Sequence, residues 1–357
     1  MSRRPRTSHP DMPARVTIRD VARAAGVSLG TASRALNRSG PVSEAALQAV
    51  ERAAKALAYA PDPIAQSLRT GTSGVVGLLV SDLANPLYAR IITAVESRLQ
   101  REGYAMVVGN THNSKAQEEL MVDLFRRRRV DGLILGPCEV ERAAYLEEIS
   151  RELAVVAMDR DFGASGSGVH VDHFRGACEA CRYLLDLGHT RIALMTSDAA
   201  LRPGRERIDG YRAALAERGV AVDETLVRAS RSAMDLSFSD ALALLSARNR
   251  PTAFICLGTR ILSGVLQATR QTGHRVPDDV SLVCVGDGDL PQLYSPAITT
   301  ISWDLEAVGT AAAEILLRAI GSGEDRAKAT EPRGQPVRLT TQLVMRESCA
   351  PPPASKT

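Results

Sequence analysis

The pattern of hydrophobic and polar positions along this chain changes near residue 74. Between Thr17 and Tyr59 the apolar residues recur at helical spacing, whereas from Val75 onward short apolar runs alternate with amphipathic segments. The first pattern predicts three short helices around a very small core. The second predicts two α/β units, roughly residues 75–160 and 165–290, each with a parallel sheet covered by helices, followed by segments that cross back.

Each of the three short helices begins after a residue that can cap it. Thr17 precedes the first helix, and Gly26 ends it. Ser28 can cap a second helix that runs to about Leu36 and packs its Ala32 and Leu36 side inward. A third helix begins after Ser43, and its buried face consists of Leu47, Val50, Ala54 and Leu57.

The expected strands and helices of the second part alternate regularly. The strands cover residues 75–80, 105–108, 132–135, 154–158, 191–196, 253–257 and 281–285. The helices cover residues 87–101, 117–128, 175–187, 206–218, 236–248 and 260–272. A ligand of such a fold would lie at the carboxyl ends of the strands, between the two units.

A proline-bounded segment connects the two parts. Pro61-Asp62-Pro63 opens it, and the Gly- and Ser-rich residues 70–74 close it. The six residues between them are too few to hold a helix in water, so this segment should fold only when something packs on it. The expected divisions are a disordered leader (1–15), a helix-turn-helix domain (16–60), a hinge helix and linker (61–73), a bilobal body (74–345) and a disordered tail (346–357).

Charge is distributed unevenly between these parts. Residues 1–70 contain eleven Lys or Arg and five Asp or Glu, a net charge of +6, whereas the whole chain carries +3 and the remainder therefore −3. A basic head on a mildly acidic body suits a polyanionic partner.

The chain shows neither an apolar leader nor a membrane-length apolar run, and its six cysteines suit reduced thiols, so a cytoplasmic protein is expected.

The second helix carries small and polar residues where a buried helix would carry leucines. Its outward residues are expected to be Ser28, Leu29, Gly30, Thr31 and Ser33. Short side chains allow a helix to enter the major groove of DNA, where base edges are read. The alternative is a small surface helix in which alanine and serine are merely tolerated.

The motifs along the chain resemble those of the lactose-repressor/galactose-repressor (LacI/GalR) family of bacterial transcription regulators. The head motif is VTIRDVARAAGVSLGTASRALN, and further matching stretches in the same order include GVVGLLVSDLANPLYARII, VDGLILGP, LGHTRIALM and RVPDDVSLV. The resemblance covers about residues 16–345. It implies a small all-α helix-turn-helix head and a bilobal, periplasmic-binding-protein-like α/β body made of two doubly wound parallel-sheet subdomains.

The resemblance also implies which residues touch DNA. Leu29 and Gly30 match the two variable positions that read bases. The positions that contact phosphates or nearby bases are Thr17, Ser28, Thr31, Ser33, Arg34 and Asn37. In the hinge, Ala65 and Leu68 are assigned to DNA, with Leu68 as a wedge into the minor groove at the centre of the operator. Anchoring of Leu68 onto the body is the alternative.

A pocket in the body is implied in the same way. Asp82, Asn85 and Tyr88 match the first strand-to-helix loop, and Asp159 and Arg207 match polar ligand contacts. Thr259 and Asp287 are also assigned to the effector, although both lie in segments that depart from the family pattern. Relatives show Asn-Asp where this chain has Gly258-Thr259, and Gly-(Phe/Tyr)-Asp-Asp where it has residues 284–287.

Two ring-hydroxyl acceptors are therefore expected to be missing from the pocket. Several arginines lie in segments near the cleft, namely Arg160, Arg205, Arg207, Arg231 and Arg260. They suggest an anionic effector, such as a sugar acid or sugar phosphate, held by guanidinium groups. The alternative is that most of these arginines face solvent.

Two motifs with metal or redox character are interpreted as structural. Cys178 and Cys181 fall inside a helix, and no second pair lies nearby. His170 and His173 are interpreted as ordinary polar residues at a strand end. No catalytic residue, metal or cofactor is expected.

The sequence thus predicts a DNA-binding transcriptional regulator, a repressor of a carbohydrate or related catabolic operon. It would bind a palindromic operator as a homodimer, without membrane partners, under the control of a small-molecule effector. The Pro-rich tail predicts that no tetramer forms. The rival interpretations are an exported sugar-binding protein, against which the head argues, and an enzyme on a doubly wound fold, for which no catalytic constellation is present.

Overall fold

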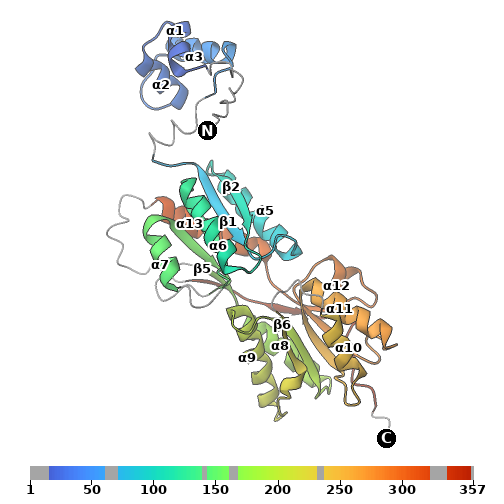
Figure 1. Ribbon diagram of the computed structural model, residues 1–357. Coiled ribbons are helices and arrows are strands. Elements are labelled where there is room, and N and C mark those ends of the chain that lie inside the picture. The colour runs from blue at the N-terminus through green and yellow to red at the C-terminus, as the bar shows by residue number, and fades with distance from the viewer. Residues whose placement is uncertain are drawn as a thin grey trace, which may run out of the picture. The chain divides into compact units, whose positions relative to one another are not determined.

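The computed structural model describes residues 16–60, 71–138, 143–160, 168–230, 237–321 and 336–354. The chain divides into two compact units, residues 1–73 and residues 74–357 (Figure 1). The expected leader (1–15) and most of the expected hinge (61–70), including Ala65 and Leu68, lie outside the described residues. No helix in the described ranges combines the length and apolar character needed to cross a membrane.

The first unit contains the three predicted helices: α1 (Ile18–Ala25), α2 (Leu29–Asn37) and α3 (Glu44–Ala56). Gly26 ends α1 in the left-handed conformation (φ 66°), which glycine adopts without strain. The core is formed by small residues, namely Val21, Ala22, Ala32, Ala35, Val50 and Ala53. Ala35 rather than Leu36 completes the buried side of α2, and Leu36 is only partly buried.

The second unit consists of two lobes, and the first lobe is built on a six-stranded parallel sheet. Its strand order is β11-β5-β4-β3-β1-β2. The strands are β1 (Val75–Val80), β2 (Ala105–Asn110), β3 (Gly132–Leu135), β4 (Ala154–Met158), β5 (Gly168–Val171) and β11 (Val337–Leu339).

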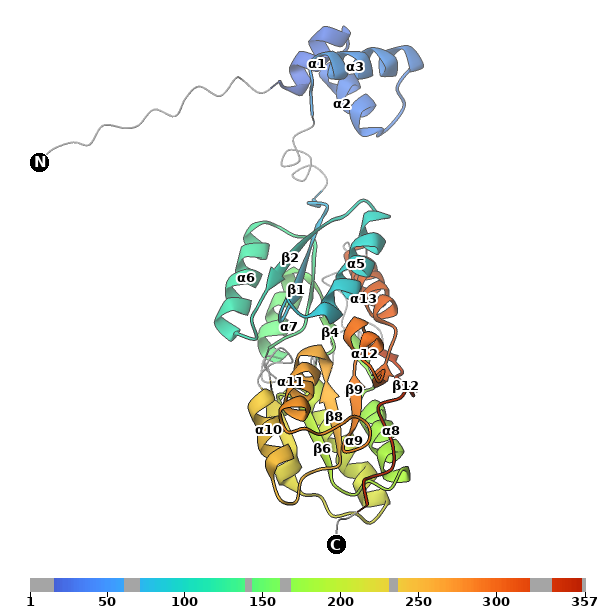
Figure 2. The same cartoon turned by 90° about the vertical axis from the view of Figure 1, so that its right-hand side faces the viewer.

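Helices cover both faces of this sheet. Val76 and Leu78 of β1 face α5 (Pro86–Gln100) and α13 (Leu305–Gly321), which pack side by side (Figure 2). Leu79 points to the opposite face, where α6 (Lys115–Arg127) and α7 (Ala143–Glu152) lie. Because successive side chains of a strand alternate between faces, the continuous apolar run of β1 supplies both layers.

The second lobe repeats this plan with one antiparallel edge strand. Its strand order is β12-β10-β9-β8-β6-β7, with β12 antiparallel to β10 and the other pairs parallel. The strands are β6 (Ile192–Ser197), β7 (Val227–Ser230), β8 (Ala253–Leu257), β9 (Ser281–Val285), β10 (Thr299–Ser302) and β12 (Gln342–Val344). The helices are α8 (His173–Asp186), α9 (Arg202–Glu217), α10 (Phe238–Ser246), α11 (Gly258–Gln271) and the short α12 (Asp289–Leu293).

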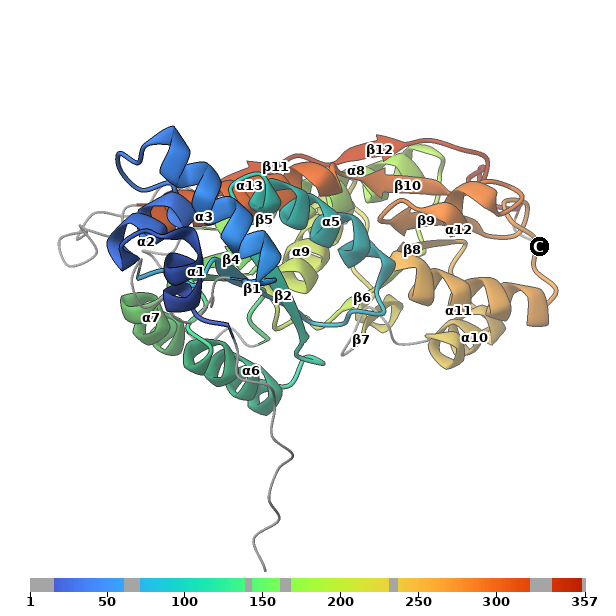
Figure 3. The same ribbon diagram turned by 90° about the horizontal axis from the view of Figure 1, so that it is seen from above.

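In the described segments, the chain crosses between the lobes three times. The crossings join β5 to α8, β10 to α13 and β11 to β12, and the last of these is visible as the pair of red strands in Figure 3. At the crossings, the backbone N–H of Asp172 donates to the Leu339 carbonyl (2.9 Å), and Arg338 forms an ion pair with the Asp172 carboxylate (2.8 Å). The expected unit boundary near residue 165 is wrong in one respect, because β5 belongs to the sheet of the first lobe, between β4 and β11.

Residues 346–354, which composition predicted to be part of a disordered tail, are instead held on the second lobe. The Ser348 hydroxyl donates to the Leu282 carbonyl (2.6 Å) and accepts from the Thr299 N–H (2.8 Å). His189 Nε2 lies 2.8 Å from the Ala350 carbonyl oxygen. The proline content of the tail concealed these contacts, which depend on the serine and backbone groups that precede the prolines.

Candidate functional sites

The first candidate site is the exposed face of α2. Ser28 caps this helix by accepting the Thr31 N–H (3.1 Å), and the two hydroxyls lie 2.9 Å apart. Ser28, Leu29, Gly30 and Arg34 are exposed, and 44% of Leu29 is accessible to solvent. A large aliphatic side chain on a small helical unit is thus presented to solvent beside a helix N-terminus that favours anions.

The other predicted DNA contacts on α2 are partly engaged within the helix. Thr31, Ser33 and Asn37 are half-buried, and the Asn37 amide donates to the Ser33 carbonyl (2.7 Å). Arg34 Nε donates to the Gly30 carbonyl (3.3 Å), which directs its guanidinium along the exposed face. The face therefore combines one apolar side chain, one cation and several hydroxyl groups.

Thr17 lies at the start of α1, and its polar groups are satisfied internally. Its backbone N–H and its hydroxyl donate to the Asp20 carboxylate at 3.0 and 2.7 Å. These bonds hold the pKa of Asp20 below its usual value. The Thr17 hydroxyl is therefore committed to Asp20, and the phosphate contact assigned to it requires this bond to be exchanged.

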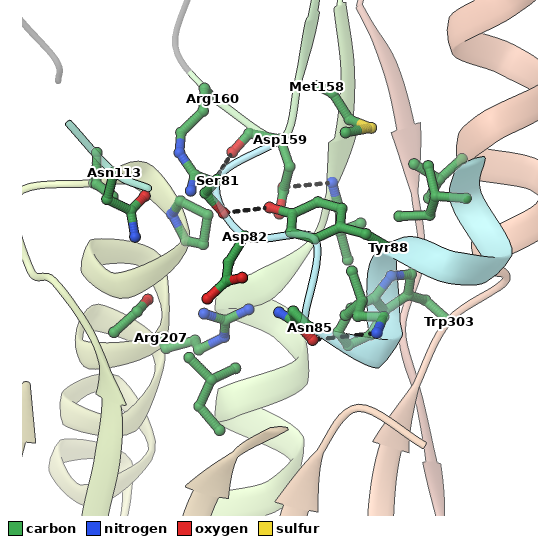
Figure 4. A pocket seen from close by; sticks show the side chains of 18 residues that line it. Ser81, Asp82, Asn85, Tyr88, Asn113, Met158, Asp159, Arg160, Arg207 and Trp303 are labelled. Carbon is green, nitrogen blue, oxygen red and sulfur yellow. Dashed lines mark hydrogen bonds between the residues drawn. The ribbon is translucent and has the colours of Figure 1, made fainter. Parts of the chain in front are cut away.

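The second candidate site is a cavity between the lobes of the second unit. It encloses about 820 Å³ of space between atoms, open solvent at its mouth included (Figure 4). Ser81, Asp82 and Asn85 enter it from the end of β1, and Met158, Asp159 and Arg160 from the end of β4. The second lobe contributes Ser197, Leu201, Pro203, Arg207 and Leu257. The cavity thus lies at the carboxyl ends of strands, where doubly wound folds bind ligands.

Five of the seven predicted effector residues line this cavity, namely Asp82, Asn85, Tyr88, Asp159 and Arg207. Thr259 and Asp287 are absent from its described lining. Thr259 lies in the first turn of α11, where its carbonyl accepts the Ser263 hydroxyl (2.7 Å). Asp287 forms an ion pair with Arg346 (2.9 Å), which holds the Asp287 pKa below its usual value although burial opposes this.

Of the arginines suggested for an anion, Arg160 and Arg207 line the cavity. Arg205 donates to the Ala200 carbonyl (3.1 Å), Arg260 is exposed on α11, and Arg231 lies outside the described residues. In the described part of the chain, the buried Nε atoms of Arg160 and Arg207 have no hydrogen-bond partner, and the same holds for Asn113 Oδ1. Buried polar atoms normally have partners, so these three atoms have unused hydrogen-bonding capacity in residues that line the cavity.

Behind the cavity wall, Asp159, His173 and Arg207 form a continuous hydrogen-bonded row. His173 Nε2 lies 2.8 and 3.0 Å from the two Asp159 carboxylate oxygens, and Arg207 Nη2 lies 3.0 Å from His173 Nδ1. A guanidinium can only donate, so Nδ1 accepts and the proton of the neutral imidazole is on Nε2. The ring of His173 also meets the edge of Trp303, with centroids 5.6 Å apart and planes at 87°.

Burial and charge set the protonation states in this row. Burial and the adjacent Arg207 lower the pKa of His173, although Asp159 opposes them. Burial lowers the pKa of Arg207 to about 10, so it remains charged at neutral pH. Burial alone would raise the pKa of Asp159, but His173 and the arginines hold it well below its usual value.

Sequence reasoning did not assign His173, Trp303 or Asn113 to this site. His173 was interpreted as an ordinary polar residue after a strand, although it is 2% exposed and directly bonded to Arg207. The chain passes from one lobe to the other between β5 and α8, so residues at this crossing must lie beside the cleft. This position was the signal that could have identified His173 as a site residue. Cys181 in the same helix is a buried thiol whose pKa burial raises to about 12, in agreement with a structural role.

Comparison with known families assigns both units. A model of bacterial regulatory proteins of the lacI family matches residues 17–62. A model of the periplasmic binding protein-like domain matches residues 181–349.

Curated relatives match over nearly the whole chain. The HTH-type transcriptional regulator DegA of Bacillus subtilis is 32% identical over 342 residues, which cover 94% of this chain and 99% of DegA. The HTH-type transcriptional repressor PurR of Vibrio campbellii is 33% identical over 318 residues, covering 88% of this chain and 95% of PurR.

Solved structures of similar architecture include a lac repressor dimer bound to operator and the anti-inducer ONPF. It superposes with a TM-score of 0.82 at 26% identity, covering 94% of this chain and 99% of that chain. A complex of the transcriptional regulator CelR with cellobiose gives a TM-score of 0.67 at 30% identity, covering 94% of this chain and all of that one. The predicted fold class, a helix-turn-helix head with two α/β parallel-sheet subdomains, is confirmed.

Proposed function

The chain belongs to the lacI family of bacterial regulatory proteins, and from this premise we propose that it represses transcription as a homodimer on a palindromic operator, under the control of a small effector. Members of this family are DNA-binding transcriptional regulators and not enzymes. The regulated genes are proposed to form a carbohydrate or related catabolic operon.

The observation that carries the DNA-binding proposal is the exposed face of α2. The family model covers this helix, and Leu29, Gly30 and Arg34 are all exposed on it. We assign base reading to Leu29 and Gly30, and phosphate or neighbouring base contacts to the polar set Thr17, Ser28, Thr31, Ser33, Arg34 and Asn37. Ala65 and Leu68 are proposed as the hinge contacts, with Leu68 entering the minor groove.

The proposed homodimer is supported by apolar residues exposed at one edge of the first lobe. Val107 lies on the edge strand β2, on the face covered by α6, and is 47% exposed. Leu120 and Leu124 lie one turn apart on α6 and are 61% and 42% exposed. We propose that a second copy of the chain covers these apolar residues. A palindromic operator requires a two-fold partner, and the solved lac repressor on operator is a dimer.

The proposed effector is anionic, a sugar acid or sugar phosphate. Arg160 and Arg207 line the cavity, and in the described part of the chain each has a buried Nε–H without a hydrogen-bond partner. Guanidinium groups bind carboxylate or phosphate oxygens most strongly. Of the two lining acids, Asp159 is already engaged by His173 and by the Val171 N–H (3.3 Å). Asp82, Asn85 and Tyr88 remain to contact hydroxyl groups of the same ligand.

Selection of duplexes from a random pool, followed by filter binding, tests the DNA-binding proposal. The expected result is enrichment of a palindrome that binds tightly at low salt and more weakly as the salt concentration rises. Lys and Arg side chains that bind phosphates release counterions from the DNA, and added salt opposes this release. Failure to enrich any sequence at low salt would contradict the proposal.

Sedimentation of the wild-type chain and of Leu120→Glu tests the dimer, and the variant is expected to sediment as a monomer.

A thermal-shift series tests the effector class with matched sugars. Glucuronate and glucose 6-phosphate are compared with glucose, which differs from them by the anionic group. Stabilisation by an acid or phosphate, lost in Arg207→Met, is the expected result. Stabilisation by glucose alone, or by none of the three compounds, would overturn the anionic assignment.

A further inference from the structure

The row Asp159–His173–Arg207 joins the two lobes across the cleft. Asp159 follows β4 of the first lobe, whereas Arg207 lies on α9, which packs on β6 of the second lobe. His173 is the first residue of α8 and lies at the crossing between the lobes. Two residues that line the cavity are therefore linked by hydrogen bonds to one imidazole, which is itself almost completely buried.

We propose that His173 is the positioning residue of the effector cavity, holding Arg207 in place only while its imidazole is neutral, so that effector binding weakens when His173 takes up a proton. This inference rests on the proposed function, because it assigns Arg207 to the effector. It concerns a residue that binds no ligand itself and acts through its two neighbours.

The chemistry of the imidazole explains the dependence on protonation. Neutral His173 donates through Nε2 to Asp159 and accepts through Nδ1 from Arg207, so both ring nitrogens are used. A proton on Nδ1 removes the acceptor and places a second cation 3.0 Å from the guanidinium. Arg207 must then turn away, whereas the bond to Asp159 persists and is strengthened by charge.

Several charged groups face this ring from the elements around it. Arg207 and Glu206 lie on α9, and Asp159 follows β4. Asp172, which precedes His173, is paired with Arg338. Burial and Arg207 favour the neutral ring, whereas Asp159 and Glu206 favour the charged ring, so protonation is expected only below the usual histidine range near pH 6.5.

The chain contains a single tryptophan, and it is the one in edge contact with His173. Trp303 also packs against the core clusters of both lobes, so its emission reports on this crossing. A charged imidazole quenches an indole more strongly than a neutral one. Titration of tryptophan fluorescence in the full chain, from about pH 7.5 to about pH 5, therefore reads the protonation of His173 without DNA or effector.

The expected result is one fluorescence transition with a midpoint below the usual value for histidine. His173→Asn keeps an acceptor oxygen near the position of Nδ1 but cannot be protonated, so the transition should disappear. In Arg207→Met the repelling cation is absent, and the midpoint should move to higher pH. The exposed His112→Asn should behave like wild type.

Persistence of the transition in His173→Asn, or its absence in folded wild-type protein, would overturn the proposal. If the variants do not fold, nitrogen-15 NMR of the wild-type histidines determines which ring nitrogen of His173 carries the proton. His173 must then show a protonated Nε2 and an acceptor Nδ1 at neutral pH, and the opposite tautomer would refute the assignment. Because no nucleic acid or effector is present, a failure of the proposed function would leave these readings unchanged.

Discussion

Gly210 of α9 lies directly against the carbonyl oxygen of Phe174 in α8, so closely that a Cβ atom at Gly210 would overlap it. The two helices therefore touch at the residue that follows His173. Arg207 is three positions before Gly210 and on the same side of α9, so this close approach brings Arg207 within hydrogen-bond distance of His173. A glycine that is not among the residues lining the cavity thus sets the geometry of the cavity wall.

Gly210→Ala is expected to push α9 away from α8. The overlap is with backbone, which cannot rotate away, so the free energy of unfolding should fall by about 1–3 kcal/mol. Urea unfolding measures this change. Gly321→Ala is the matched control, because its Cβ would meet nothing within 4 Å at the end of α13, and equal stability of the two variants would contradict the packing argument.

Gly30→Ala tests the exposed face of α2. The added Cβ would have only the Ser28 hydroxyl nearby, at 3.9 Å, so the helix should gain about 0.5–1 kcal/mol from its higher propensity. If Gly30 faces base edges, binding to the selected operator should nevertheless change while binding to random duplex stays constant. A variant that is more stable and binds both duplexes as before would argue that Gly30 lies outside the interface.

Leu68→Ala tests the hinge contact, which remains a prediction because Leu68 lies outside the described residues. Loss of an apolar wedge should weaken specific binding about tenfold or more and leave non-specific binding nearly unchanged, because only the bent operator needs the wedge. Filter binding to both duplexes measures the ratio. Equal losses on the two duplexes would favour the alternative in which Leu68 anchors onto the body.

The sequence was sufficient to predict the order of elements wherever a strong local pattern exists. Strands β1, β3, β4, β8 and β9 have the predicted bounds, because continuous apolar runs occur where a strand is buried on both faces. Strand β7 was missed because none of its residues is buried at this edge of the sheet, and β5 was missed because His170 interrupts its short apolar run. Helix α13, an alanine-rich segment that packs tightly against α5, was not predicted from the sequence.

The site was predictable in part for a similar reason. Asp82, Asn85, Tyr88, Asp159 and Arg207, which line the cavity, were assigned through the resemblance of their segments to the family pattern. The role of His173 depends on a third element and on the approach of Gly210, which no local pattern encodes. The effector contact of Asp287 remains a prediction, and its ion pair with Arg346 could not be foreseen because the two residues are distant in sequence.

Ser348→Ala tests whether the C-terminal segment contributes to stability. The hydroxyl is fully buried and serves both the Thr299 N–H and the Leu282 carbonyl, so its removal leaves a buried donor without a partner. The free energy of unfolding should fall by about 1–3 kcal/mol in urea unfolding. Met345→Ala, three residues earlier and 66% exposed, is the control, and it should behave like wild type.

Acid should destabilise the second lobe through His189. This side chain is 1% exposed, and its Nε2 lies 2.8 Å from the Ala350 carbonyl oxygen and its Nδ1 2.8 Å from the Thr252 hydroxyl. Burial lowers the pKa of His189 in the folded chain, so below about pH 6.5 the unfolded chain binds the proton first. The free energy of unfolding should therefore decrease as pH falls, by up to about 1.4 kcal/mol per pH unit for this residue. In His189→Gln this part of the slope should vanish, whereas exposed His112→Gln should retain it, and an unchanged slope in His189→Gln would show that other groups cause the acid sensitivity.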